Sequence, residues 1–141
     1  MVLSKKDKAY FNIAKEISKL SDFPRIHIGC VAVYKHRVIA TGMNSQKTNP
    51  LQKKYNRFRF DDDAKPHCIH SEVACLTSLI GNPRIDFKNV SLYIYRENGK
   101  NELALARPCN ACMKLIMDLG IRHIYYTNTC GFSHEKIFDK E

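Results

Sequence analysis

The segments His70-Ser71-Glu72 and Pro108-Cys109-Asn110-Ala111-Cys112 decide both the fold and the chemistry of this 141-residue chain. Together they offer one imidazole and two thiols that suit a single zinc ion: His70, Cys109 and Cys112. Three protein ligands leave the fourth tetrahedral position to water, which is typical of a catalytic zinc site and not of a structural one. Glu72, two residues after the histidine, is placed to carry a proton. The two segments therefore predict a hydrolytic zinc centre.

Each segment also predicts the start of a buried helix. Residues 71–80 carry apolar side chains at helical spacing, with Gly81 as the stop signal, and residues 109–119 repeat the pattern before Gly120. His70 and Glu72 then lie at the first turn of one helix, and the two cysteines lie at the first turn of the other. Amide groups at a helix N-terminus stabilise carboxylate and thiolate charge.

His-x-Glu followed by Pro-Cys-x-x-Cys resembles the signature of the zinc-dependent cytidine and deoxycytidylate deaminase superfamily. The resemblance runs from Ile28 to Thr127 and implies an α/β, three-layer, cytidine deaminase-like fold with a mixed central sheet of four to five strands flanked by helices. It implies Zn²⁺ as cofactor, held by His70, Cys109 and Cys112. The implied reaction is hydrolytic deamination of cytosine to uracil by a zinc-activated water, with Glu72 as the proton shuttle. Adenine and guanine deaminases share this metal motif, so the base follows from resemblance alone.

The same resemblance implies three substrate-binding residues. Asn44, in a Gly-x-Asn at the end of a strand, corresponds to a family asparagine that hydrogen-bonds the sugar, although an asparagine here can also simply stabilise a turn. The backbone of Ser71 is expected at the base edge. Tyr126 is expected to stack on the base, and Tyr125 must then face the opposite side of the strand.

The remaining pattern predicts the order of elements along one domain spanning residues 1–141. An amphipathic helix over 7–20 precedes a hairpin of strands 28–34 and 38–42. Strands follow at 90–95 and 121–127, and the helix between them implies that they are parallel. Residues 132–138 are expected to fold back as a short fifth strand.

Two stretches depart from a minimal version of this family. Residues 46–66 interleave cations with Tyr55, Phe58 and Phe60 and then become acidic at residues 61–63. This composition suits stacking on a phosphate-bearing substrate, but a solvated insertion with aromatics tucked into the core would have the same sequence. Residues 102–107 separate the third strand from Pro108, whereas in the family this strand usually runs directly into the proline. The zinc ligands stay intact, but the neighbouring wall of the pocket is harder to predict.

Bulk properties restrict the class of protein. Hydrophobic content of 44% supports a globular fold, and no apolar run reaches the ~20 residues that span a bilayer. Six cysteines without a paired framework match a reducing compartment, so a cytoplasmic protein without membrane contact is expected. The net charge of +9 attracts polyanions without identifying one.

Several alternatives stay open from sequence. The expected substrate is a cytosine-containing nucleotide, as for a deoxycytidylate deaminase, and the alternative is cytosine in single-stranded DNA or RNA. A catalytically idle zinc protein that binds nucleic acid is a third hypothesis, against which the intact Glu72 argues. Cys68 and His67 could complete a structural zinc module. A homo-oligomer is expected from resemblance.

Overall fold

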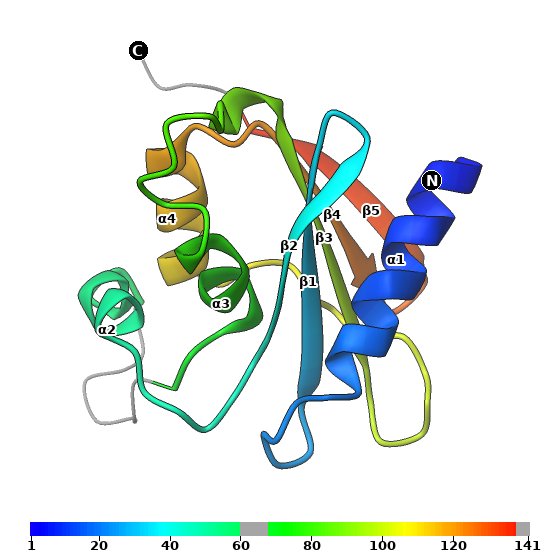
Figure 1. The fold of residues 1–141 in the computed structure, drawn as a ribbon. Helices are drawn as coiled ribbons and strands as arrows, with labels where there is room; N and C mark the ends of the chain where they lie inside the picture. Colours follow the sequence, from blue (N-terminus) through cyan, green and yellow to red (C-terminus); the bar gives the residue numbers. More distant parts are fainter. Residues whose placement is uncertain (60–67, 138–141) are drawn as a thin grey trace.

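The computed structural model describes residues 1–59 and 68–137, and five strands form one sheet with helices on both faces (Figure 1). The elements follow in the order α1 (Lys5–Ser18), β1 (His27–Tyr34), β2 (Arg37–Met43), α2 (Pro50–Asn56), α3 (Ser71–Thr77), a 3₁₀ turn η1 (Phe87–Asn89), β3 (Val90–Glu97), α4 (Asn110–Leu119), β4 (His123–Asn128) and β5 (Gly131–Lys136).

The sheet is mixed, with strand order β2-β1-β3-β4-β5. β1 pairs antiparallel with β2 and β3, β3 pairs parallel with β4, and β5 folds back antiparallel on β4. The predicted hairpin, the parallel pair joined by a helix and the fifth strand are thus confirmed. A parallel pair needs a long crossover, and α4 supplies it.

Three layers result, with α1 on one face of the sheet and α2, α3 and α4 on the other (Figure 1). Strand β1 is buried on both faces, so its apolar run does not alternate with polar residues. Val31 and Val33 pack toward Phe11 and Ala14 of α1, while Cys30 and Ala32 join the core beneath α3 and α4. The cytidine deaminase-like architecture expected from sequence is therefore present.

Helix boundaries differ from the sequence prediction in three places. Helix α1 begins earlier because of a capping box. The Ser4 hydroxyl accepts from the Asp7 backbone N–H, and the Asp7 carboxylate accepts from the Ser4 backbone N–H. Helix α3 ends at Thr77 and not at residue 80, with Ile80 41% exposed. Helix α2 was not predicted; Asn49 caps it by accepting from the N–H groups of Leu51 and Gln52.

Two glycines set how closely the helices approach the sheet. A Cβ built on Gly29 would lie 2.1 Å from the Ala14 carbonyl oxygen of α1. A Cβ built on Gly42 would lie 2.3 Å from the Cys75 backbone nitrogen and 2.6 Å from the Ser71 carbonyl oxygen, both in α3. Helix α3, whose first turn bears Glu72, therefore packs directly on the backbone of β2.

Within the described ranges, no helix combines the length and the apolar character required to cross a bilayer.

The contact at Gly42 predicts a large cost for the smallest substitution. Gly42→Ala forces α3 away from β2, and overpacking of this kind costs about 1–3 kcal/mol or more. Gly99→Ala is the matched control, because a Cβ at Gly99 meets open space. Urea unfolding should give a clearly lower midpoint for Gly42→Ala alone; equal midpoints would contradict the close approach.

Candidate zinc centre and active site

The predicted ligands come together from two helix starts. The Nδ1 atom of His70 lies 3.5 Å from the Cys109 Sγ and 3.3 Å from the Cys112 Sγ, and the three ligand atoms all lie within 4.8 Å of one another. Tetrahedral zinc with ordinary Zn–N and Zn–S bonds requires an N to S separation of roughly 3.5 Å. Both the donor set and its spacing therefore fit one zinc ion.

The secondary structure explains this convergence. His70 is the N-cap of α3 and Cys109 is the N-cap of α4, and neither side chain is used for a capping hydrogen bond. The two ligands are therefore fixed in position by backbone geometry while their donor atoms remain directed at the cluster. Cys112 follows in the first turn of α4 and is fully buried.

The cluster favours thiolate charge before any metal binds. The hydrogen bond with Cys112 lowers the pKa of Cys109 to about 4, His70 adds to this effect, and burial opposes it. The same hydrogen bond, together with burial, raises the pKa of Cys112 well above its usual value. The site thus favours the thiolate form of Cys109, the form in which cysteine binds a metal.

Glu72 is the buried carboxyl of the site, with 5% of its surface exposed. Burial raises the pKa of this carboxyl, whereas the positive charge of His70 and a hydrogen bond from Ser71 lower it. The Ser71 hydroxyl donates to Oε1 of Glu72 at 2.5 Å. A carboxyl with a raised pKa can both accept and return a proton near neutral pH.

Gln52 was missed by sequence reasoning. Its side chain is completely buried, and its Oε1 accepts the backbone N–H of His70 at 3.0 Å. Its Nε2 donates to Asn56 Oδ1 at 2.7 Å, which fixes the amide orientation. Gln52 lies on α2, so the Asn49-Pro50 helix-start signal was the available clue to this support.

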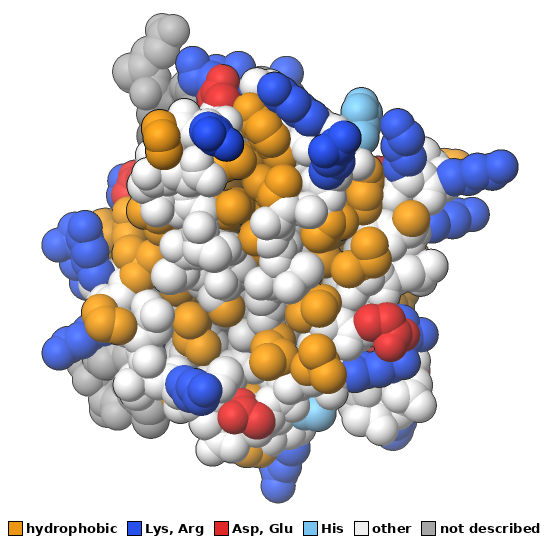
Figure 2. All heavy atoms as spheres, viewed as in Figure 1, with side chains coloured by type: hydrophobic (Ala, Val, Ile, Leu, Met, Phe, Trp, Pro, Cys, Tyr) orange, Lys and Arg blue, Asp and Glu red, His pale blue; other side chains and the backbone are white. Residues whose placement is uncertain are grey.

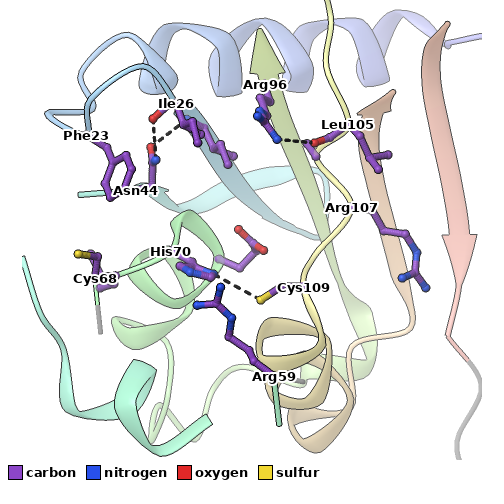
Figure 3. A pocket seen from close by; sticks show the side chains of 14 residues that line it. Phe23, Ile26, Asn44, Arg59, Cys68, His70, Arg96, Leu105, Arg107 and Cys109 are labelled. Carbon is purple, nitrogen blue, oxygen red and sulfur yellow. Dashed lines mark hydrogen bonds between the residues drawn. The ribbon is translucent and has the colours of Figure 1, made fainter. Parts of the chain in front are cut away.

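A cavity of about 520 Å³ opens onto the cluster (Figure 3). His70, Glu72 and Cys109 form one side of it, and Asn44 and Phe23 lie on another. Three arginines also contribute to the lining: Arg59, Arg96 and Arg107. Glu72 is the single acidic residue among the described lining residues, so the cavity has a positive balance of charge.

Asn44 lines the cavity, and it also organises the loop that contains it. Its Oδ1 accepts from the Ile28 N–H at 2.9 Å and from the Ser21 hydroxyl at 2.7 Å, and its Nδ2 donates to the Ile26 carbonyl at 2.7 Å. The turn-stabilising role considered from sequence is therefore real. One Nδ2 hydrogen has no acceptor among the described residues and is left for a ligand.

Two of the expected substrate contacts are not among the described residues that line the cavity. Tyr126 faces the zinc side of the sheet, as strand alternation requires, and is buried in the core. Tyr125 lies on the opposite face, stacked on Tyr93. Ser71 is fully buried and its hydroxyl donates to Glu72, whereas the expected contact of its backbone with the base stays a prediction.

The structural-zinc alternative gains nothing from Cys68. This residue lines the cavity, but the ligand cluster in the described part of the chain contains only His70, Cys109 and Cys112. His67 lies outside the described residues.

The aromatic side chains of residues 46–59 are already occupied by the protein. Tyr55 is buried and its hydroxyl donates to Asp118 Oδ2 at 2.8 Å. Phe58 packs against the core with Arg57 and Lys114 over its ring, 4.8 and 5.6 Å from the centroid. These two rings support α2 against α4 and are not presented for base stacking. Phe60 and residues 61–63 lie outside the described residues.

A mixed sheet with a His-Cys-Cys cluster and a buried glutamate defines a zinc-type hydrolytic site. The model of the family described as "Cytidine and deoxycytidylate deaminase zinc-binding region" matches residues 4–128. The chain belongs to this zinc-dependent cytidine and deoxycytidylate deaminase family, and membership supports an enzyme that removes the amino group of cytosine by hydrolysis.

Solved structures agree with the fold. The chain resembles the apo dCMP deaminase of cyanophage S-TIM5, with 21% identity over 90% of this chain and 86% of that one and a TM-score of 0.63. It also resembles the cytidine deaminase of Burkholderia pseudomallei, with 16% identity, coverage of 95% and 93%, and a TM-score of 0.64. The S-TIM5 enzyme in complex with dCMP and dUMP matches at 18% identity, coverage of 89% and 83%, and a TM-score of 0.61. No curated protein matches the sequence significantly.

The cluster predicts one zinc ion per chain. Cys112→Ser removes a buried ligand and should abolish stoichiometric zinc binding, measured by metal analysis after dialysis. Cys130→Ser is the matched control, because this free cysteine is exposed and outside the cluster. Zinc retained by Cys112→Ser at wild-type affinity would rule out the assigned ligand set.

The hydrogen bond from the His70 N–H to Gln52 predicts that removing this side chain lowers zinc affinity less than removing a ligand does. Gln52→Leu leaves the His70 N–H without its acceptor, and loss of a group that orients a ligand typically lowers metal affinity about 10- to 100-fold. Competition with a fluorescent zinc chelator measures this change. Gln46→Leu, which alters an exposed glutamine bonded to Asp22, should leave zinc affinity unchanged.

Proposed function

We propose that this protein hydrolyses the amino group of a free cytosine nucleotide, as a deoxycytidylate deaminase does, and releases ammonia and the uracil nucleotide. The observation that carries this proposal is the placement of buried Glu72 beside the His70-Cys109-Cys112 cluster at one side of a substrate-sized cavity. The family supports the reaction type, and the arginines of the cavity support a negatively charged substrate.

His70, Cys109 and Cys112 would hold the zinc ion, which when bound supplies Lewis-acid activation of water near neutral pH. The carboxyl of Glu72 takes a proton from the attacking water and delivers it to N3 of cytosine. The attack forms the C4–O bond. Glu72 then takes the second proton from the hydroxyl on C4 and delivers it to the amino group, which leaves as ammonia while the C4–N bond breaks and the C4=O double bond forms. Positioned proton transfer of this kind contributes about 10²- to 10⁴-fold to rate.

The other residues bind and orient the nucleotide. Asn44 offers its remaining Nδ2 hydrogen to a sugar hydroxyl while its other bonds hold the amide rigid. The Ser71 hydroxyl orients the carboxyl of Glu72 by donating to Oε1. Apolar side chains at Phe23, Ile26 and Ile28 exclude water around the base.

A free nucleotide is favoured over a polynucleotide because the described aromatic side chains that could stack on further bases are packed into the protein. Tyr55 and Phe58, the described rings of the basic and aromatic stretch, are packed into the protein. On the face of the molecule shown in Figure 2, Lys and Arg side chains lie mainly toward the outline, with largely hydrophobic and uncharged surface between them and no continuous basic stripe among the described residues. A solved relative, the S-TIM5 enzyme, is described in complex with dCMP and dUMP.

A cytoplasmic location and a homo-oligomeric state complete the proposal. All six cysteines are free, which matches a reducing compartment. Light scattering of the purified protein tests the oligomer directly, and a monomer mass would refute it.

Replacing the proton carrier should separate chemistry from metal binding. Glu72→Gln preserves shape but cannot shuttle a proton, so ammonia release from dCMP should fall at least about 100-fold. Zinc content should remain one per chain, because Glu72 is not among the ligands. Undiminished activity in Glu72→Gln, or no activity of the zinc-loaded wild type on any cytosine nucleotide, would contradict the proposal.

A further inference from the structure

The connection between β3 and α4 forms an ordered wall of the cavity. After β3 the chain turns, and the Asn98 N–H donates to the Glu102 carbonyl at 2.8 Å. Leu103 then forms an antiparallel bridge with Glu97, and the Ala104 N–H donates to the Arg96 carbonyl at 3.0 Å. Residues 103–107, called here the returning segment, therefore run back along the end of β3 toward the zinc site.

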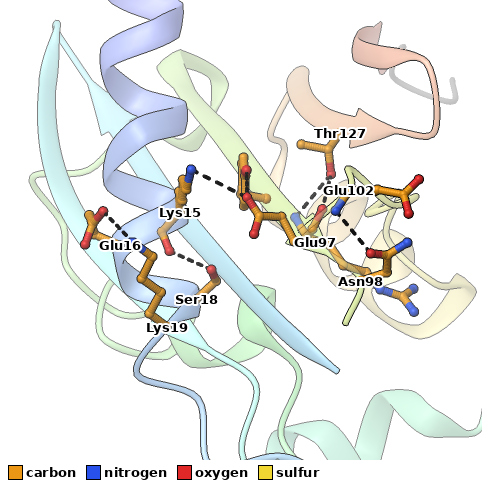
Figure 4. A network of polar contacts seen from close by, with 10 residues as sticks. Lys15, Glu16, Ser18, Lys19, Glu97, Asn98, Glu102 and Thr127 are labelled. Atoms are coloured by element: carbon orange, nitrogen blue, oxygen red, sulfur yellow. Dashed lines mark hydrogen bonds and ion pairs between the residues drawn. The ribbon is translucent and has the colours of Figure 1, made fainter. Parts of the chain in front are cut away.

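Thr127 of β4 fixes this segment from the other side (Figure 4). Its hydroxyl is fully buried, accepts the Arg96 N–H at 3.1 Å and donates to the Ala104 carbonyl at 2.7 Å. The Ala106 N–H donates to the Thr127 carbonyl at 2.9 Å. The returning segment is thus wedged between the ends of β3 and β4, and Arg96 lies at its base.

Arg96 shares one row of the sheet with the proposed sugar-binding residue. It pairs directly with Ile28 across β1 and β3, and Ile28 in turn is hydrogen-bonded to Asn44 at the end of β2. All three residues line the cavity, and the backbones of Asn44 and Arg96 are roughly 10 Å apart at two strand spacings. A sugar held by Asn44 therefore has Arg96 on its far side (Figure 3).

The guanidinium of Arg96 lacks the partners that a half-buried charge requires. Its Nη1 donates to the Leu105 carbonyl at 3.3 Å, but its Nε is buried without an acceptor among the described residues. No carboxylate in the described part of the chain forms an ion pair with it; neighbouring Glu97 is paired with Lys15 and bonded to Tyr95. A buried donor without an acceptor requires a physical explanation, and a ligand that binds beside it is one such explanation.

Arg107, in the same wall, provides a contrast. Its Nε and Nη2 donate to the two carboxylate oxygens of Glu135 at 2.8 and 3.2 Å. One bidentate edge of this guanidinium, Nε with Nη2, is therefore occupied by a carboxylate of the protein. Of these two arginines, Arg96 alone has no such carboxylate among the described residues, and its fork suits the oxygens of a phosphate.

We propose that Arg96 binds the 5′-phosphate of the substrate and so selects nucleotides over nucleosides. This rests on the proposed deaminase function for the position of the base at Glu72. The base lies at the zinc side, the sugar meets Asn44, and the phosphate reaches Arg96 at the base of the returning segment. The insertion between β3 and α4 thereby forms the wall beside Arg96, with the Leu105 carbonyl accepting from its Nη1.

The test compares nucleotide with nucleoside in binding and in turnover. Zinc-loaded wild type, Arg96→Gln and Arg96→Lys are titrated with the products dUMP and deoxyuridine by calorimetry, and kcat/KM is measured for dCMP and deoxycytidine. Arg96→Gln should lose about 10- to 100-fold in dUMP affinity and in kcat/KM for dCMP. Its affinity and kcat/KM for the nucleosides should stay within about threefold of wild type. Arg96→Lys keeps the positive charge but loses the planar pair of donors, so its dUMP affinity should lie between those of the wild type and Arg96→Gln.

Arg84→Gln is the matched control for loss of one positive charge, because Arg84 is exposed and outside the cavity lining. It should bind dUMP as wild type does. Equal loss of nucleotide and nucleoside binding in Arg96→Gln would overturn the proposal, since it would make Arg96 a structural support of the wall. A wild type that shows no preference for dUMP over deoxyuridine would overturn it as well.

Two further outcomes keep this proposal separate from the deaminase function. If dUMP binds in an Arg96-dependent manner but dCMP releases no ammonia, the proposed reaction fails and the phosphate assignment stands. If Arg96→Gln weakens binding of a single-stranded oligonucleotide carrying one deoxyuridine but not of dUMP, the phosphate belongs to a polynucleotide and the mononucleotide assignment is overturned.

Discussion

The contact between His70 and the two cysteines is the interaction on which the arrangement of this protein depends. It joins the start of α3, which follows the β1-β2 hairpin, to the start of α4, which connects β3 to β4. For the two starts to meet, α3 must lie directly on β2, which Gly42 permits, and α4 must cross over between the parallel strands β3 and β4. A bound zinc ion would therefore fasten the helical layer together as well as serve chemistry, because metal ligation in such sites contributes to folding free energy.

The sequence was most informative where function depends on local spacing. A His-x-Glu and a Pro-Cys-x-x-Cys at helix starts fix their own geometry within one turn each, so the ligands and Glu72 could be assigned without knowing the rest of the fold. The parallel direction of β3 and β4 followed from the helix that connects them, and even the short β5 was predicted. The order of the five strands in the sheet was not. The features that were predicted depend on patterns within single elements and on the order of elements along the chain.

What the sequence did not reveal depends on contacts between distant segments. Gln52 supports His70 from 18 residues away; the Asn49-Pro50 signal marks the start of its helix, but the sequence does not show that this helix packs against His70. Tyr126 was expected to stack on the substrate because strand alternation shows which face of the sheet a residue is on. Alternation does not show how far along the strand the cavity lies, and Tyr126 is not among the described residues that line it. Phe58 belongs to the core because α4 packs against α2, a contact that composition cannot indicate.

The two sides of the cavity are under different structural constraints. The side formed by α3 and α4 is constrained by coordination chemistry, because any shift of the His70, Cys109 or Glu72 donors would change the reaction itself. The side formed by the returning segment is held by hydrogen bonds from its backbone to Thr127 and to β3, and by the contact of Arg107 with Glu135. The backbone bonds do not depend on which side chains the segment presents. Side chains on this wall can change without disturbing the metal ligands. An insertion at residues 102–107 thus leaves the metal ligands intact while it forms the wall beside Arg96 of β3. The proposed recognition of phosphate acts through the guanidinium of Arg96, whose Nε has no acceptor among the described residues.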